Sequence, residues 1–452
     1  MASNGVIFAL VVELSCRTFS DRIPTMRRSL AYAASLLFLA GPLHAQGLRS
    51  TITKLFTFGD CGQPLCLAGS VLAQNGHGDH FIPADVAGNA TILSFLADAI
   101  GLSSADVPVS AASSGATFTF VNGLPQKTAE SSGPVFGERG PTLGRGRLLV
   151  GANVTNVDFS TLRGIPLNDI ELNFTHQDVG APGLGDSPFE NDFIEVRTQL
   201  QVNMYVSSFY LTYGVTDRLD LGVSIPLAHV SVSGSSDAQI VPFGTPAEHF
   251  FSGTPTDPVL TAHSAAAGAA TGLGDISLRA KLNLNSSQRA SFSLLADARL
   301  PTGDADNFLG AGAFGFRGLG VFSARFGNFT PHFNGGFFYR GGSLENNALL
   351  ATGGFDHLMT DWATMSFDII SEWQLGASKL TIPPVVHIIA PFQRTVTPTN
   401  IPNERDDIVN ASFGLKLRMD SGATGVVNMI LPMNRGGLRP DVIWTLGLEY
   451  NF

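Results

Sequence analysis

The chain has 452 residues, of which 14% are charged, and it contains 50 Gly, 33 Phe and 3 Cys. Its formal net charge of -10 argues against a nucleic-acid partner, because neutralising phosphates needs clustered Lys and Arg. The mean hydropathy of +0.19 is high for a soluble protein, yet no mature segment approaches the ~20 apolar residues of a transmembrane helix. The apolar residues are instead spread over many short segments, as a membrane β-barrel requires.

Residues 1–45 predict an export signal. A short basic region begins at Met26, residues 30–40 form an apolar core, and Ala45 is a small residue at a cleavage position. This order predicts a secretory signal peptide cut after Ala45, with Met26 as the true start and residues 1–25 as an upstream extension. A soluble core segment is the alternative.

Residues 46–112 are rich in Gly, Ala, Ser and Asp and predict a plug inside a barrel or a periplasmic segment, with one short helix at 90–100. Cys61 and Cys66 predict a disulfide in an exported protein, since their spacing is not the C-x-x-C of a redox pair. The run from His77 to His80 resembles a metal-ligand cluster, but its spacing fits no specific site and a polar turn is preferred. We therefore expect neither a metal nor a cofactor.

Residues 113–452 predict an all-β fold, a transmembrane antiparallel up-and-down β-barrel of about 14 strands (range 12–16). Side chains alternate between apolar and polar faces every two residues; for example, Leu278 and Leu282 share one face while Arg279 and Lys281 share the other. A soluble sandwich has the same alternation, with a second sheet in place of lipid. The expected strands are 114–121, 146–158, 168–177, 193–214, 218–233, 272–284, 290–301, 311–325, 329–340, 347–357, 362–375, 408–419, 423–433 and 441–452.

Loop lengths favour the membrane barrel over the sandwich. From residue 215 onward, short connections such as 215–217 alternate with long ones such as 234–271 and 376–407. Membrane barrels have short periplasmic turns and long external loops. The alternation predicts a periplasmic C-terminus, and counting back through the strands places the N-terminal segment on the periplasmic side too.

The last strand ends in a pattern that is typical of outer-membrane barrels. Trp444, Tyr450 and Phe452 lie on its apolar face, and the chain ends on Phe452. This terminal aromatic strand resembles the signal that the barrel-insertion machinery reads. We therefore expect an outer-membrane location, with outer-membrane lipid, lipopolysaccharide and the insertion machinery as partners.

Five motifs stand out between residues 213 and 334: YGVTDRLDLG at 213–222, GLGDI at 272–276, LPTGD at 300–304, NFLG at 307–310 and PHFN at 331–334. Together they resemble the outer-membrane transporter barrels of the meta-pathway of phenol degradation, which are similar to the long-chain fatty-acid transporters. The motifs look like turns and strand starts, so no family binding residue is carried over. The resemblance covers about residues 194–452 and implies passive uptake of small hydrophobic or aromatic molecules.

Charged residues on the expected lumen face are the candidate pore lining. Both signs occur, so pairing across the interior as a structural network is preferred over a substrate site. A hydrophobic path past Phe308 and Leu309 is a further possibility. The candidates are Arg197, Asp275, Arg279, Lys281, Asp297, Arg299, Lys416, Arg418 and Glu449.

Three functions remain open at this point. The preferred one is a channel or transporter for small hydrophobic molecules, and the runner-up is a structural or adhesive barrel without transport. An outer-membrane lipid hydrolase is the third, although no G-x-S-x-G nucleophile elbow occurs in the chain, so we expect no enzyme.

Overall fold

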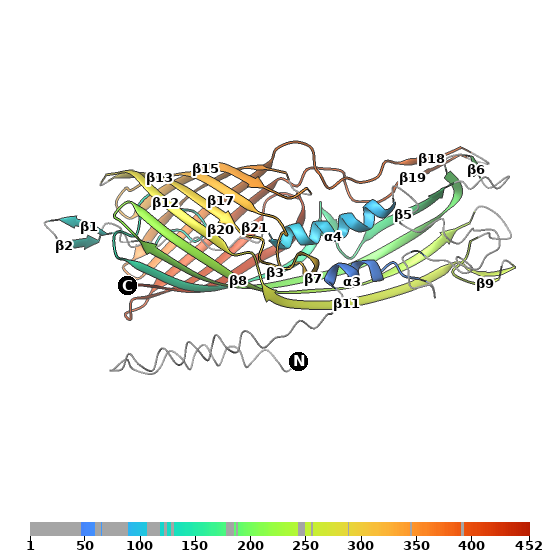
Figure 1. Cartoon of the computed structure of the whole chain (residues 1–452), viewed down its shortest axis with the longest axis horizontal. Helices are drawn as coiled ribbons and strands as arrows, with labels where there is room; N and C mark the ends of the chain where they lie inside the picture. Colours follow the sequence, from blue (N-terminus) through green and yellow to red (C-terminus); the bar gives the residue numbers. More distant parts are fainter. Residues whose placement is uncertain are drawn as a thin grey trace. The chain divides into compact units, whose positions relative to one another are not determined.

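Twelve antiparallel strands close into a barrel in the computed structural model (Figure 1), which describes residues 47–58, 65, 89–105, 118–121, 124–127, 131–177, 185–186, 189–242, 249–254, 256–287, 289–343, 346–389 and 393–452. The barrel closes where the last strand, β22, pairs with the first, β3. In order around the barrel, the strands are β3 (Leu148–Leu162), β7 (Phe189–Gly214), β8 (Leu219–Val241), β12 (Ser277–Ser286), β13 (Ala290–Arg299), β14 (Gly315–Ala324), β15 (Phe329–Arg340), β16 (Ala348–Thr360), β17 (Ala363–Gln374), β20 (Ile408–Arg418), β21 (Ala423–Pro432) and β22 (Leu438–Asn451).

The predicted closed antiparallel barrel is confirmed, and its strand number lies within the expected range. Two expected strands lie outside the closed ring. Residues 168–177 form β5 (Ile170–Gln177), which pairs with the far part of β7, and residues 114–121 contribute β1 (Phe118–Val121), which pairs only with β2 (Leu124–Lys127). The predicted signal peptide, the Cys61–Cys66 pair and the His77–His80 run lie outside the described residues.

Short turns join neighbouring strands at one end of the barrel, for example residues 215–218 and 361–362. We call this the short-turn end, and the opposite end the long-loop end. The long connections include residues 300–314, which contain the short helix η2 (Ala305–Asn307), and residues 375–407, which contain the hairpin of β18 (Val386–Ile388) and β19 (Arg394–Val396). Three further short strands are β4 (Ile165–Pro166), β6 (Gly185–Asp186) and the β9–β10 hairpin (Ser252–Thr254 and Asp257–Val259).

The outward face of the barrel is apolar along the strands. Leu294, Phe413 and Leu446 are each 44–53% exposed, although the residues that precede them on the inward face, Ser293, Ser412 and Thr445, are polar and buried. Tyrosine, tryptophan and phenylalanine side chains lie outward near both ends, as in the aromatic girdles of membrane barrels. They include Tyr205, Tyr339, Trp373 and Trp444 toward the long-loop end, and Tyr213, Phe326, Trp362, Tyr450 and Phe452 at the short-turn end.

Strands β7 and β8 continue past the barrel at the long-loop end. There β8 pairs with β11 (Thr261–Leu273) and β7 pairs with β5, so that β11, β8, β7 and β5 form a four-stranded extension. Polarity inverts in this extension: Ile194, Val196 and Val232 point inward and are buried. Outside a bilayer the outer face meets water, so the apolar side chains must turn inward.

The extension was only partly predicted, because residues 234–271 were expected to be a loop. Strand β11 consists largely of Ala, Gly, Ser and Thr, which give little apolar contrast between its faces. Small residues are needed where helix α3 (Leu48–Lys54) presses on this strand: a Cβ at Gly268 would lie 2.7 Å from Thr51 Oγ1.

Two helices pack on the apolar inner face of the extension (Figure 1). Leu48 and Ile52 of α3, and Phe95 and Ile100 of α4 (Asn89–Ala105), belong to the same buried cluster as the inward side chains of β5, β7 and β8. These helices therefore lie at the long-loop end, which corrects the expected short-turn side for the described residues 47–58 and 89–105. Their apolar side chains match the one apolar inner surface that the sheet offers. Among the described helices, none is long and apolar enough to cross a membrane.

Candidate functional site

A segment with no regular secondary structure, residues 131–147, lies inside the barrel; we call it the lumen segment. It touches inward-facing side chains of strands all around the ring. Ser132 N bonds to Thr364 Oγ1 of β17, Glu138 N to Asn334 Oδ1 of β15, and Leu143 N to Asp220 Oδ2 of β8. It leaves the lumen at the short-turn end, where Gly146 N donates to Gly214 O. The sequence assigned these residues to the barrel wall or its approach, and the plug was expected within residues 46–112.

Two charged residues anchor the lumen segment. Arg139, which is 3% exposed, binds Asp356 of β16, with Nε 2.8 Å from Oδ1. Glu138 accepts from Arg279 Nη1 at 2.7 Å and from Lys281 Nζ at 3.2 Å, both on β12. The segment is thus held across the short-turn half of the lumen by buried, charge-assisted hydrogen bonds.

Other buried pairs fill the same half of the barrel. Lys416 Nζ lies 3.1 Å from Glu449 Oε2, and Tyr210 Oη donates to Glu449 Oε1 at 3.0 Å. His332 Nε2 lies 2.6 Å from Asp368 Oδ1, and both side chains are fully buried. Because the wall carries polar groups that no lipid can satisfy, they bond to one another across the interior.

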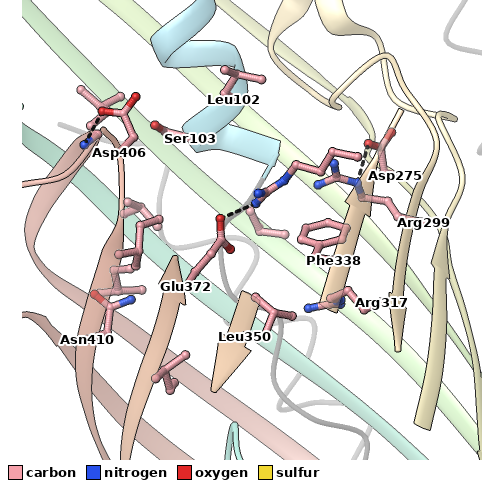
Figure 2. Close-up of a pocket in the computed structure, with 18 of the residues that line it drawn as sticks. Leu102, Ser103, Asp275, Arg299, Arg317, Phe338, Leu350, Glu372, Asp406 and Asn410 are labelled. Atoms are coloured by element: carbon pink, nitrogen blue, oxygen red, sulfur yellow. Dashed lines mark hydrogen bonds and ion pairs between the residues drawn. The ribbon is translucent and has the colours of Figure 1, made fainter. Parts of the chain in front are cut away.

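A cavity of about 350 Å³ lies between the lumen segment and helix α4 (Figure 2). The lumen segment contributes Phe136 and Glu138 to its lining, and α4 contributes Leu102 and Ser103. One wall is apolar and comes from β3, β7, β8, β22 and the 300–314 loop. Its residues are Val157, Phe159, Met204, Val206, Ala228, Leu309 and Ile443.

Five arginines also line the cavity, and we call them the arginine cluster: Arg279, Arg299, Arg317 and Arg340 on the adjacent strands β12 to β15, and Arg439 on β22. Strand register explains how the four arginines on β12 to β15 come together. Asp297 lies opposite Arg279 on one side and Arg317 on the other, and Arg317 lies opposite Phe338 on β15. One step nearer the long-loop end, Gly315 lies between Arg299 and Arg340. Direct cross-strand neighbours point to the same face, so these side chains meet in the lumen.

Phe338 lies at the centre of the arginine cluster (Figure 2). Its ring centroid is 4.3 Å from Arg340 Cζ, 5.3 Å from Arg299 Cζ and 5.6 Å from Arg317 Cζ. Cation–π attraction at such distances holds guanidinium groups over a ring. A side chain at Gly315 would disturb this arrangement, because its Cβ would lie 3.0 Å from Phe338 Cε2.

Carboxylates balance part of the cluster's charge. Asp297 accepts from both Arg279 and Arg317, and Glu372 accepts from Arg340 Nη2 at 2.7 Å. Asp275 Oδ2 lies 3.9 Å from Arg299 Nε, but its oxygens accept hydrogen bonds from Gly303 N and Ala311 N. The wall therefore combines strong positive charge with carboxylates, of which Asp297 and Asp275 each accept from two donor groups.

Arg163 closes the rim of the cavity at the long-loop end. It is 2% exposed, its Nε lies 2.7 Å from Asp406 Oδ1, and its guanidinium carbon lies 5.0 Å from the Phe95 ring centroid. Its Nη1 also donates to Pro402 O at 3.1 Å. One side chain thereby ties together β3, helix α4 and the 375–407 loop.

The candidate charges are not all brought to one place. Asp275, Arg279, Asp297 and Arg299 line the cavity, whereas Lys281 lies below it beside Glu138, and Lys416 pairs with Glu449. Arg418 lies at the short-turn end of β20.

Arg197 does not face the lumen. It lies on the outer face of the extension with 65% of its side chain exposed, 3.4 Å from both Glu171 and Glu195. The expectation was wrong because polar side chains point outward once β7 leaves the membrane-spanning part of the barrel.

Several residues that line the cavity or anchor the lumen segment escaped the sequence analysis. Glu138 and Arg139 lie in a segment without periodicity, and Arg317, Arg340 and Arg439 were not among the candidates although they occupy inward positions. The LPTGD and NFLG motifs were noticed in the sequence and could have indicated part of the cavity lining. They form a loop folded inward beneath α3 and α4, with Phe308 fully buried and Leu309 in the apolar wall. Asn307 Oδ1 accepts from Leu48 N, which links the loop to α3.

Groups of three or more His, Cys, Asp or Glu side chains placed to hold a metal ion are absent from the described part of the chain. No curated protein matches the sequence.

Among solved structures, the chain is similar to a crystal structure of an outer membrane channel from Pseudomonas putida F1, at 13% identity over 69% of this chain and 98% of that one, with a TM-score of 0.41. It is also similar to a FadL homologue from Pseudomonas aeruginosa, at 11% identity over 68% and 90% of the two chains, with a TM-score of 0.32. A third is the toluene transporter TodX of P. putida, at 8% identity over 68% and 89%, with a TM-score of 0.30.

The sequence also matches a protein family over part of its length. Residues 180–351 match the family described as "Putative MetA-pathway of phenol degradation". The matched range includes the motifs from YGVTDRLDLG to PHFN. The family match confirms that this chain resembles the outer-membrane barrels of the meta-pathway phenol-degradation type.

Proposed function

We propose that the protein is an outer-membrane channel for passive uptake of small hydrophobic or aromatic molecules. The observation that carries the proposal is the lumen cavity, whose apolar wall continues upward into the apolar inner face of the extension. A molecule that enters at the long-loop end would pass between this face and helices α3 and α4, which pack on it, before it reaches Val206 and Ala228. Burial of apolar surface along this path favours entry without an energy source.

Orientation and partners belong to the same proposal. The short-turn end faces the periplasm and the long-loop end faces outward, toward lipopolysaccharide. An N-terminal signal peptide exports the chain, and the insertion machinery reads the terminal strand through Trp444, Tyr450 and Phe452. The exposure of these three side chains on the lipid-facing side of β22 supports that role.

The solved structures that resemble this chain include a channel and a toluene transporter by name. A structural barrel without transport has one observation in its favour, the lumen segment that crosses the short-turn half on buried ion pairs. The channel proposal requires this segment to yield or to leave a narrow path.

Uptake of the fluorescent probe N-phenyl-1-naphthylamine by cells with an intact outer membrane tests the proposal. Cells that express the protein should take up the probe faster than cells without it. The variant Ala228→Trp, which fills the cavity, should return the rate to background. The variant Leu221→Trp is the matched control, because Leu221 lies on the same strand but is 46% exposed on the lipid face. Equal uptake with and without the protein would favour the structural barrel.

A further inference from the structure

We propose that the lumen cavity is a binding site for small aromatic carboxylates, with the carboxylate at the arginine cluster and the ring against the apolar wall. The inference deepens the proposed function and rests on it. It assigns a charged head group to the ligand, which uptake of neutral hydrocarbons does not require.

The arginine cluster carries more positive charge than the carboxylates around it can balance. The five guanidinium groups of the cluster face four carboxylates: Glu138, Asp275, Asp297 and Glu372. Glu138 is shared with the ammonium group of Lys281, and Asp297 is shared between two arginines. Positive charge is therefore in excess in an enclosed, low-dielectric space, where an uncompensated charge is costly. An anion is the partner that such a wall favours.

Two arginines of the cluster have donor groups that a ligand in the cavity can use. Arg317 keeps 40% of its side chain exposed although it faces the interior of the barrel, so its surface is available to a ligand in the cavity. Arg439 is 6% exposed, and its Nε has no hydrogen-bond partner among the described residues. A planar carboxylate can accept two parallel hydrogen bonds from a guanidinium group.

The rest of the cavity is small and lined mainly by apolar side chains. Met204, Val206 and Leu309 line the side opposite the arginines, so a ligand needs an apolar body as well as a charged head. Phe95 and Leu102 of α4 close the space above, and Phe136 closes it below. A volume of about 350 Å³ is near the lower end for small-molecule sites, which favours a compact ring over a long chain.

The test compares benzoate with benzamide, which has the same size and no charge. Isothermal titration calorimetry on the full-length protein in detergent should show that benzoate binds at least about tenfold more tightly than benzamide, since hydrogen bonds to charged groups discriminate by that order. Added salt should weaken benzoate binding and leave benzamide binding unchanged.

Two variants locate the carboxylate. Arg317→Gln should weaken benzoate binding about tenfold and leave benzamide binding unchanged, while Asp297 keeps Arg279 as its partner. Arg439→Gln should act in the same direction and provides a second test if the first variant folds poorly. Arg289→Gln removes an exposed arginine in the short turn between β12 and β13 and should change nothing.

The outcomes separate this inference from the proposed function. If benzoate and benzamide bind equally, or if the folded Arg317 and Arg439 variants bind benzoate as the parent does, the carboxylate site is wrong. Uptake of the neutral naphthylamine probe would still support the channel. If benzoate binds as expected but the probe does not enter cells, the site stands as a binding site and the uptake proposal fails.

Discussion

Arg139 of the lumen segment and Asp356 of β16 form an ion pair that is buried in the barrel, 217 residues apart in the chain. Ser131 Oγ lies 2.5 Å from Asp356 Oδ2 and 2.9 Å from Arg139 Nη2, so the pair sits in a small hydrogen-bonded group. This group joins the start of the lumen segment to the barrel wall.

Asp356→Asn should loosen the lumen segment. It leaves the Arg139 guanidinium buried beside a neutral amide, and breaking a buried pair costs about 3 kcal/mol or more. In planar bilayers, single channels of this variant should open more often than those of the parent. Asp361→Asn, in the exposed turn after β16, is the matched control and should behave like the parent. Unchanged gating in Asp356→Asn would mean that this pair does not hold the segment.

The lumen segment, rather than residues 46–112, should limit ion flow. Replacing residues 132–140 by a Gly-Ser sequence of equal length removes the contacts of Glu138 and Arg139 but keeps the connection to β3. Conductance should rise clearly in this variant. Deletion of residues 46–112 should raise conductance less, because its described helices pack at the long-loop end. The opposite order of the two conductances would return the plug to residues 46–112.

Lys416 and Glu449 should depend on each other. Lys416→Met leaves the Glu449 carboxylate, which is 3% exposed, with Tyr210 as a remaining hydrogen-bond donor. The free energy of unfolding should fall by about 3–5 kcal/mol. The double variant Lys416→Met/Glu449→Gln should lose less than the sum of the two single changes. Urea unfolding in detergent, followed by tryptophan fluorescence, measures all three; strict additivity would show that the two groups do not interact.

The lipid face should reject charge most strongly near mid-membrane. Leu294 is 47% exposed in the middle of β13, so Leu294→Arg should lower the free energy of unfolding in lipid vesicles by about 2–4 kcal/mol. Phe326→Arg, in a short turn at the barrel end, should cost about 0–1 kcal/mol. Equal and negligible costs at both positions would show that the exposed apolar face does not contact lipid.

Gly315 should be needed for the arginine cluster. A Cβ there lies 3.0 Å from Phe338 Cε2 and 3.2 Å from Arg299 Nε, so Gly315→Ala should destabilise the barrel by about 1 kcal/mol or more. At Gly318, on the same strand, the nearest atom to an added Cβ is at 3.7 Å. Gly318→Ala should therefore be neutral or slightly stabilising, because it reduces the freedom of the unfolded chain. Both values come from the same urea titration, and a neutral Gly315→Ala would show that the cluster has room to spare.

The sequence by itself determined the barrel. Alternation such as Leu278, Arg279, Ala280, Lys281 and Leu282 has a period of two, and the structure places both leucines outward and Lys281 inward and buried. The two-residue period of the side chains, and the face to which each side chain points, follow from strand geometry alone. A short stretch of sequence is therefore enough to predict them. The alternation of short and long connections added the up-and-down order. Among the candidate charges, Asp275, Arg279, Asp297 and Arg299 were found for the same reason.

Only the tertiary structure decided where the bilayer ends along each strand. Arg197 has the same alternation as the lumen-facing charges, but it lies on the part of β7 that rises beyond the barrel, where water replaces lipid outside. Side-chain period cannot report which solvent a face meets. The partners of Glu138 and Arg139 could not be predicted from the sequence either. They lie 141–217 residues away in the chain, on strands that surround the lumen segment only once the barrel has closed. The lumen segment itself has no periodic pattern that would indicate these contacts. Long-range pairing in a closed sheet is set by the register of all twelve strands together, and no single stretch of sequence carries it.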